Sequence, residues 1–369
     1  MPSGFPHALS PDELTARRHA EVTAFLAGRR LDPAWLSALM RDQVGEGLLL
    51  LTSSPVHGLA NSTSDLDFIR VQEAGIDGPR IATKIFENGH HLEVVSFGRN
   101  ELASSLDELN RLAGLPAEET VAGFRAWDKQ REPRRKQTER IVNGITLDGT
   151  APFLPWLPAL SRVWSRASLQ TAVEQAVHAV LAEAAGESRG RVGYAYNVLL
   201  HLMDALLSHH GDVYTTRKWY VLRWSRLVAG GGWHDERLQA VASDVERLRK
   251  GIGAALGPAA AGEPLAGAFT AAVLDAVRAT GTARSVTVGA EVTGSVQPYL
   301  PGASLLLDSR AAVVLPAVGA ERDLALTGSP VGLEELSGLD PKAAASLLRA
   351  LRAGAARLRI GYRGARAGR

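Results

Sequence analysis

The stretch from Leu48 to Val71, LLLLTSSPVHGLANSTSDLDFIRV, constrains the fold of this chain more than any other. It opens on four leucines, which have the length and apolarity of a buried strand. A turn of small residues follows, and a second strand is predicted to begin at Asp65 and Asp67. Side chains two apart on a strand project from one face, so we expect both carboxylates on the same side of a sheet, roughly 6 to 7 Å apart along the strand.

Two neighbouring carboxylates repel each other unless a cation lies between them. Hard divalent ions take oxygen ligands, and Mg²⁺ is the common choice where a phosphate completes the coordination shell. The pair Asp65 and Asp67 therefore predicts a magnesium site. The alternative is a solvated turn end, because acids are common where a strand begins.

A third carboxylate, Glu93, lies on a predicted hairpin. We predict strands at 80–87 and 90–97, joined by an Asn-Gly turn whose two positions tolerate a positive φ. This two-residue loop places Glu93 opposite Lys84. Glu93 is the only acid inside its strand and is our candidate for the third metal ligand; the alternative is a cross-strand ion pair with Lys84.

This arrangement resembles the nucleotidyltransferase superfamily that includes DNA polymerase β and the kanamycin-type and minimal nucleotidyltransferases. The family pattern is a hydrophobic strand, a Gly-Ser turn, a serine followed by Asp-x-Asp, and a further acid on a later strand. The matching positions in this chain are Ser54, Ser64, Asp65, Asp67 and Glu93. Ser53 stands where the family has glycine; it is small enough for close approach of a phosphate but lacks the freedom of glycine at positive φ.

The resemblance implies an enzyme that moves a nucleoside monophosphate from an NTP, expected to be ATP, to a small-molecule acceptor and releases pyrophosphate. It also implies two Mg²⁺ ions held by the three carboxylates, Asp65, Asp67 and Glu93. The triphosphate would bind Ser53 and Ser54 of the turn and Ser64, the residue before the acid pair.

A later segment, 211–220 (GDVYTTRKWY), resembles the part of the minimal and kanamycin-type enzymes that lies near the nucleotide. The resemblance adds three nucleotide-binding residues, Tyr214, Arg217 and Lys218, of which Lys218 would balance the charge of the triphosphate. The alternative is that the aromatic residues of this segment are core residues and that its cations only make helix contacts.

Two rival functions stay open. One is a non-catalytic protein of the same fold whose C-terminal module binds a peptide or protein. The other is transfer of a nucleotide to a protein or a tRNA.

Composition narrows the class of protein. The 369 residues include 41 Lys and Arg against 39 Asp and Glu, a net charge of +2, which argues against a dedicated nucleic-acid binder. There is no cysteine, which excludes disulfides, thiolate zinc sites and cysteine nucleophiles. No apolar run approaches the roughly 20 residues that a bilayer requires, and we see no signal peptide, so we expect a cytoplasmic protein outside the membrane.

We predict an α+β fold in three parts. These are a small mixed-sheet nucleotidyltransferase domain at 1–150, a helical domain at 151–283, and a strand-rich, winged-helix-like module at 284–369. Helices are expected at 10–28, 32–43, 100–113, 118–127, 168–185 and 189–209. In the last part we expect strands at 285–292, 304–307, 312–315 and 357–362, and helices at 324–331, 333–336 and 341–353. The predicted recognition helix, 341–352, is mostly apolar and favours a peptide or protein partner over DNA.

Three further features of the sequence can each be interpreted as functional or as structural. The basic segment 131–140 would contact the triphosphate or an acidic acceptor, or it would be a solvated linker or helix face; we favour the linker or helix face. His57 would touch a phosphate or only fill its loop. The polar stripe of Tyr194, Asn197, His201 and Asp204 would line a cleft or face solvent.

Overall fold

The computed structural model describes residues 5–75, 82–130, 132–230, 233, 235–253, 265–293, 295–301, 303–307, 312–316 and 329–364. It is a mixed α+β structure, as the sequence predicted. It divides into two compact units. The first comprises Met1–Leu115, Ala122–Trp164 and Leu207–Leu227, and the second comprises Pro116–Val121, Ser165–Leu206 and Val228–Arg369.

The first unit is built on a four-stranded sheet of β1 (Leu48–Leu51), β2 (Leu66–Gln72), β3 (Thr83–Glu87) and β4 (His90–Gly98). The order across the sheet is β1-β2-β4-β3, with β2 and β4 parallel and the other two pairs antiparallel. Its helical elements are α1 (Pro11–Gly28), α2 (Pro33–Val44), α3 (Arg99–Gly114), α5 (Glu132–Asn143), η1 (Leu154–Trp156) and η2 (Arg217–Trp219). Helices with residues in both units are α4 (Ala117–Gln130), α6 (Leu157–Ala184), α7 (Ser188–His209) and α8 (Tyr220–Gly230).

The first two helices begin at side-chain caps that the sequence signals. The Ser10 hydroxyl accepts a bond from the backbone N–H of Glu13, and the Glu13 carboxylate accepts one from the backbone N–H of Ser10 at 2.8 Å. Asp32 accepts from the backbone N–H groups of Ala34 and Trp35 at the start of α2. These caps satisfy amide groups that have no partner inside the helix, and they fix where each helix starts.

The predicted start of the helix at 168–185 is wrong. We predicted a helix from Ser168 because of the prolines at 150–158, but α6 begins at Leu157. Pro158 lies in the first turn of α6, where the missing N–H has no helical partner and its fixed φ suits a helix. Proline therefore starts this helix and does not interrupt it.

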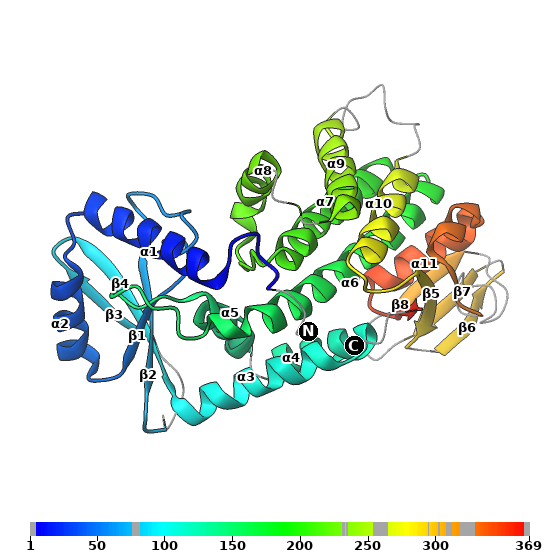
Figure 1. Cartoon of the computed structure of the whole chain (residues 1–369). Coiled ribbons are helices and arrows are strands. Elements are labelled where there is room, and N and C mark those ends of the chain that lie inside the picture. The colour runs from blue at the N-terminus through cyan, green and yellow to red at the C-terminus, as the bar shows by residue number, and fades with distance from the viewer. Residues whose placement is uncertain are drawn as a thin grey trace. The chain divides into compact units, whose positions relative to one another are not determined.

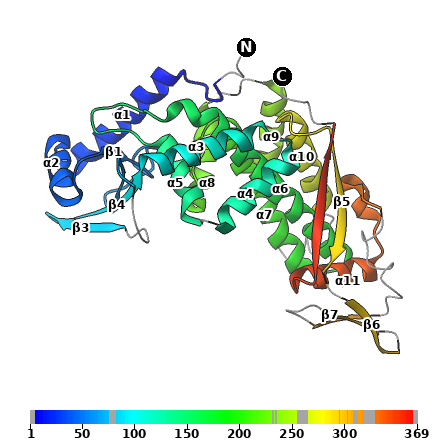
Figure 2. The ribbon, with the colours of Figure 1, turned by 90° about the horizontal axis from the view of Figure 1, so that it is seen from below.

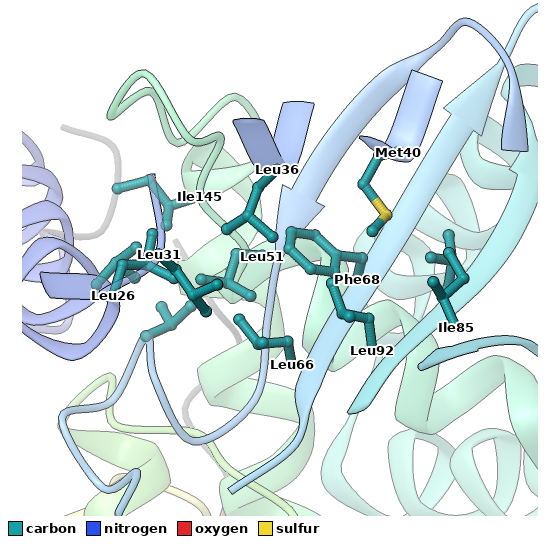
Figure 3. Close-up of a cluster of buried hydrophobic side chains, with 13 residues drawn as sticks. Leu26, Leu31, Leu36, Met40, Leu51, Leu66, Phe68, Ile85, Leu92 and Ile145 are labelled. Atoms are coloured by element: carbon teal, nitrogen blue, oxygen red, sulfur yellow. The ribbon is translucent and has the colours of Figure 1, made fainter. Parts of the chain in front are cut away.

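The core of the first unit lies between one face of the sheet and the helices α1 and α2 (Figures 1 and 3). Phe68 of β2 and Leu92 of β4 pack with Leu26, Leu36 and Met40 of the two helices. Each of the five side chains is at most 2% exposed. Side chains alternate along a strand, so Asp67 lies on the face of the sheet opposite to this core. Further along β2 and β4, α3 covers that opposite face.

The second unit contains two three-stranded antiparallel sheets, ordered β10-β5-β9 and β6-β7-β8. Figure 2 shows β5 and β10 running alongside each other. The strands are β5 (Ser285–Val292), β6 (Ser295–Leu300), β7 (Ala303–Leu307), β8 (Ala312–Pro316), β9 (Val331–Gly332) and β10 (Ala356–Arg363). The helical elements are α9 (Glu236–Gly251), α10 (Ala266–Ala279), η6 (Leu333–Gly338) and α11 (Pro341–Arg352).

Four of these six strands were predicted, and β6 and β9 were not. The predicted helix at 324–331 lies mostly outside the described residues, and its last residue, Val331, begins β9. The predicted helix at 333–336 is the 3-10 element η6, and the one at 341–353 is α11.

The polar stripe of α7 is engaged inside the second unit. The Ser168 hydroxyl donates to the buried carboxylate of Asp204 at 2.5 Å. The guanidinium of Arg352 donates to the Tyr194 hydroxyl at 2.9 Å and also pairs with Glu187 at 2.7 Å. These two residues of the stripe therefore hold helices together. Among the described residues, no helix combines the length and the apolar character needed to cross a membrane.

Replacing Phe68 with Ala should lower the free energy of unfolding by about 3 to 5 kcal/mol, because it removes a buried aromatic side chain and leaves a cavity. Phe86→Ala is the matched control, since the Phe86 side chain is 74% exposed. Urea denaturation followed by circular dichroism measures both. Similar losses in the two variants would contradict the assigned core.

Candidate active site

Asp67 and Glu93 lie side by side on neighbouring parallel strands. In the register of β2 with β4, Asp67 is the Cα partner of Glu93, and in the register of β3 with β4, Glu93 faces Lys84. The second pairing is the one that the hairpin predicted. Both acids are partly buried, and in the described part of the chain Lys84 makes no ion pair with Glu93. Two carboxylates are therefore adjacent on one face of the sheet without a lysine between them.

Asp65 precedes β2, and its carboxylate contacts a histidine. Its Oδ1 lies 3.0 Å from Nδ1 of His91, whose ring stacks on Phe86 with centroids 4.6 Å apart. The Asp65 side chain is 58% exposed. Within the residues that the structure describes, no three His, Asp or Glu side chains converge as a set of metal ligands.

The turn after β1 contacts Asp67 through its backbone. The backbone N–H and the hydroxyl of Thr52 both donate to the carbonyl oxygen of Asp67, at 2.9 and 3.0 Å. The next residue, Ser53, has φ +64°, in the left-handed region that favours glycine. Its hydroxyl oxygen is buried and has no hydrogen-bond partner within the described part of the chain. The position where the resembled family has glycine thus requires positive φ in this chain too, and serine adopts it.

The other two predicted serines have different surroundings. The backbone carbonyl of Ser54 accepts from the N–H of Leu59 at 2.9 Å, which closes the loop after the turn. The Ser64 hydroxyl donates to the side chain of Asn61 at 3.0 Å, and its backbone carbonyl accepts from Arg29 at 2.6 Å. Ser64 therefore stabilises the loop that leads into β2.

Arg140 is a site residue that we did not single out from the sequence. It lies on α5, and its Nη2 is 3.8 Å from Oδ2 of Asp67. Its side chain is 15% exposed. The only sequence signal for Arg140 was its place in the basic segment 131–140. Contact of that segment with a triphosphate was one of the interpretations given above.

The residue before it, Glu139, is buried. Burial raises the pKa of Glu139 to about 7, against hydrogen bonds from Asn143 at 3.0 Å and Thr215 at 3.3 Å that favour the charged form. Asn143 also donates to the carbonyl of Val213 at 2.8 Å and accepts from Arg18 at 2.7 Å. This network ties the segment 213–215 to α5.

Tyr214, which lies in that segment, is near the carboxylates. Burial raises the pKa of its hydroxyl, and the charges of Glu139 and Asp67 raise it further. Its ring stacks on His57 with centroids 4.6 Å apart and an angle of 23°. The structure thus brings together Asp67, Glu93, Arg140 and Tyr214 from four separate parts of the chain.

Arg217 and Lys218 are exposed on η2. The Nζ of Lys218 lies 5.1 Å from the centroid of the Trp219 ring. No hydrogen bond or ion pair joins either cation to the three carboxylates in the part of the chain that is described.

An ion pair between Arg223 and Asp212 positions His57. Its Nδ1 lies 3.6 Å from Oδ1 of Asp212, and Arg223 donates to Oδ2 of Asp212 at 3.1 Å and to the Tyr214 carbonyl at 2.8 Å. Although burial opposes it, the Arg223 guanidinium holds the pKa of Asp212 well below its usual range. Burial lowers the pKa of His57, so its ring is neutral at pH 7. No separate signal in the sequence pointed to Asp212 or Arg223.

The donor set suits a hard cation. Asp67 and Glu93 offer the oxygen ligands that Mg²⁺ prefers, from adjacent positions on paired strands. Asp65 can join them only by leaving His91, a rotation that its exposed side chain permits. Arg140 supplies positive charge beside these carboxylates, and the backbone of the turn at Ser53 supplies N–H groups.

We predict that Ser53→Gly raises the free energy of unfolding by about 0.5 to 1 kcal/mol, because glycine has no penalty at φ +64°. Ser54→Gly is the matched control and should lower it by up to about 1 kcal/mol, since Ser54 does not have positive φ. Urea denaturation of the two variants measures the difference. A loss of stability in Ser53→Gly equal to that in Ser54→Gly would show that the turn does not need positive φ.

The stability of the folded chain should depend on pH through Glu139. The pKa of Glu139 is about 7 in the folded chain against 4.5 for the unfolded reference, so its contribution to stability is complete below pH 4.5 and is lost as the pH rises through 7. Relative to Glu139→Gln, the wild type should therefore lose about 3 kcal/mol of stability between these values. Urea denaturation at several pH values tests this, and a constant difference between the two proteins would rule it out.

A comparison with curated proteins gives no match. A comparison with protein families matches residues 9–365 to one that is described as a family of unknown function, DUF6001. Because this match spans nearly the whole chain, the protein belongs to that family.

Proposed function

We propose that this protein is a Mg²⁺-dependent nucleotidyltransferase that moves a nucleoside monophosphate, AMP from ATP, to a small-molecule acceptor and releases pyrophosphate. The observation that carries this proposal is the pairing of Asp67 with Glu93 on parallel strands, next to a turn with positive φ at Ser53. This arrangement of strand, turn and acids, together with the resemblance in sequence, supports nucleotidyl transfer as the activity.

In this proposal the carboxylates Asp65, Asp67 and Glu93 hold two Mg²⁺ ions. When bound, these ions neutralise the charge that develops on the phosphate oxygens. Asp67 and Glu93 have fixed positions because they belong to paired strands, whereas Asp65 has to exchange its contact with His91 for the metal.

The triphosphate binds the turn and the cations around it. Backbone N–H groups and hydroxyls at Ser53 and Ser54 hold the phosphates, and the buried Ser53 hydroxyl, which has no hydrogen-bond partner among the described residues, is available to donate. Arg140, Arg217 and Lys218 supply positive charge to the leaving pyrophosphate, where negative charge builds up as the bond breaks. Tyr214 lines the nucleotide side, and Ser64 acts by stabilising the loop.

The reaction is an in-line displacement. The acceptor oxygen attacks the α-phosphorus, a new P–O bond forms, and the bond from the α-phosphorus to the pyrophosphate oxygen breaks. The pyrophosphate keeps the electron pair of that bond. The acceptor proton passes to Glu93 or to whichever of the three acids lies nearest to the hydroxyl.

The proposed architecture follows the same resemblance. The four-stranded sheet belongs to a nucleotidyltransferase domain at 1–150, followed by a helical domain at 151–283 and a winged-helix-like module at 284–369. The apolar side chains of α11, among them Leu347 and Leu348, are buried within the second unit, so a peptide or protein partner of that module would bind residues that it exposes. The protein acts in the cytoplasm without membrane or nucleic-acid binding.

One observation favours a second candidate, a non-catalytic protein of the same fold. The Asp65 carboxylate bonds to His91 and points to no shared ligand position with the other two acids. A protein that had lost nucleotidyl transfer would retain the strands, and its acids would contact other side chains of the protein, as Asp65 contacts His91.

Titration calorimetry with Mg²⁺ and an ATP analogue that has a methylene bridge between the α- and β-phosphates tests the proposal. We expect Mg²⁺-dependent binding to the wild type that is weakened at least about tenfold, or lost, in Asp67→Asn and Glu93→Gln. Glu87→Gln, which removes an exposed acid from the same hairpin, is the matched control and should bind like the wild type.

Binding that is independent of Mg²⁺, or unchanged in both variants, would remove the carboxylates from the nucleotide site. Absence of binding for the analogues of all four NTPs would favour the non-catalytic candidate. Where binding is seen, pyrophosphate release with small-molecule acceptors, proteins and tRNA distinguishes the acceptor classes.

A further inference from the structure

The first unit contains a cavity of about 540 Å³ at the other end of β2 from Asp67. This is within the range of about 300 to 1,000 Å³ that small-molecule sites occupy. Val71 lines the cavity, four residues beyond Asp67, so the two lie roughly 13 Å apart along the strand. Ile69 is buried between them. The cavity is therefore separate from the carboxylates.

The walls of the cavity are apolar and come from three parts of the chain. Leu102 and Leu106 line it from α3, Val71 from β2, and Phe153 and Trp156 from the segment around η1. The two aromatic rings are tilted at 51° with centroids 6.0 Å apart. Leu48, at the start of β1, also lines the cavity and is 37% exposed. An apolar ligand that covered these side chains would gain from removal of their surface from water.

The rim of the cavity is acidic. Its charged lining residues are three acids, Glu46, Glu73 and Asp107, and one cation, Arg99. Glu73 pairs with Arg99 at 2.6 Å, and Glu46 pairs with Arg41 at 3.0 Å.

Asp107 differs from the other two acids. Among the residues that the structure describes, its carboxylate has no hydrogen bond or ion pair. Ala103, one turn earlier on α3, is small and lines the same wall. The rim therefore carries one negative charge without a partner, beside a wall that leaves room for a ligand.

We propose that this cavity binds a small molecule that combines a flat apolar body with a single protonated amine. The apolar body lies between α3 and the rings of Phe153 and Trp156, and the ammonium group pairs with Asp107. A neutral molecule of the same shape lacks that ion pair, and an anionic one meets uncompensated negative charge at the rim.

Three matched probes test the proposal by titration calorimetry on the full chain: 4-phenylbenzylamine, 4-phenylbenzyl alcohol and biphenyl-4-carboxylate. We expect the amine to bind with one-to-one stoichiometry, at least about threefold more tightly than the alcohol and about tenfold more tightly than the carboxylate. Asp107→Asn should abolish the preference for the amine over the alcohol and leave the affinity for the alcohol unchanged.

Two further variants make the test specific. Ala103→Trp fills the cavity and should weaken all binding at least about tenfold, with circular dichroism and the melting temperature as folding checks. Asp42→Asn removes an exposed acid outside the cavity and should leave the three affinities unchanged. The proposal is overturned by no saturable binding of any probe, by equal binding of all three, or by a preference for the amine that survives in Asp107→Asn. If Ala103→Trp does not fold, the Asp107→Asn comparison decides alone.

Discussion

The parallel pairing of β2 with β4 is the constraint on which the candidate site depends. Side chains alternate along a strand, so a slip of one residue in this register would turn Glu93 away from Asp67. The register is fixed from the opposite face, where Phe68, Leu92 and Val94 are buried against the helices. Apolar packing on one side of the sheet thus keeps the two acids at paired positions on the other.

The helix α5 provides a second support. Its buried residues Glu139 and Asn143 bind the segment that carries Tyr214, while its neighbouring residue Arg140 reaches Asp67. A buried carboxylate is unfavourable unless hydrogen bonds satisfy it, and here an amide and a hydroxyl do so. The same helix therefore positions an aromatic residue and a cation at the acids. Arg223 completes this arrangement from α8 by holding Asp212 and the Tyr214 carbonyl.

Local signals in the sequence predicted much of the fold. The helix starts near Ser10 and Asp32, the Asn-Gly hairpin and the pairing of Glu93 with Lys84 were correct, because each depends on residues close together in the chain. The start of α6 was wrong because proline has opposite effects in the first turn of a helix and in its interior. The short strand β9 was missed because its pairing with β5 depends on contacts distant in sequence.

The sequence by itself determined that Asp65 and Asp67 precede or begin a strand after a small-residue turn, since alternation and turn propensity are local properties. Only the tertiary structure decided that Asp67 lies beside Glu93, that Asp65 contacts His91, and that Arg140 reaches the acids. Strand order, register and side-chain partners depend on how separate segments pack, and no pattern within one segment specifies them. The cavity beside α3 has the same origin, because its walls come from segments that only packing brings together.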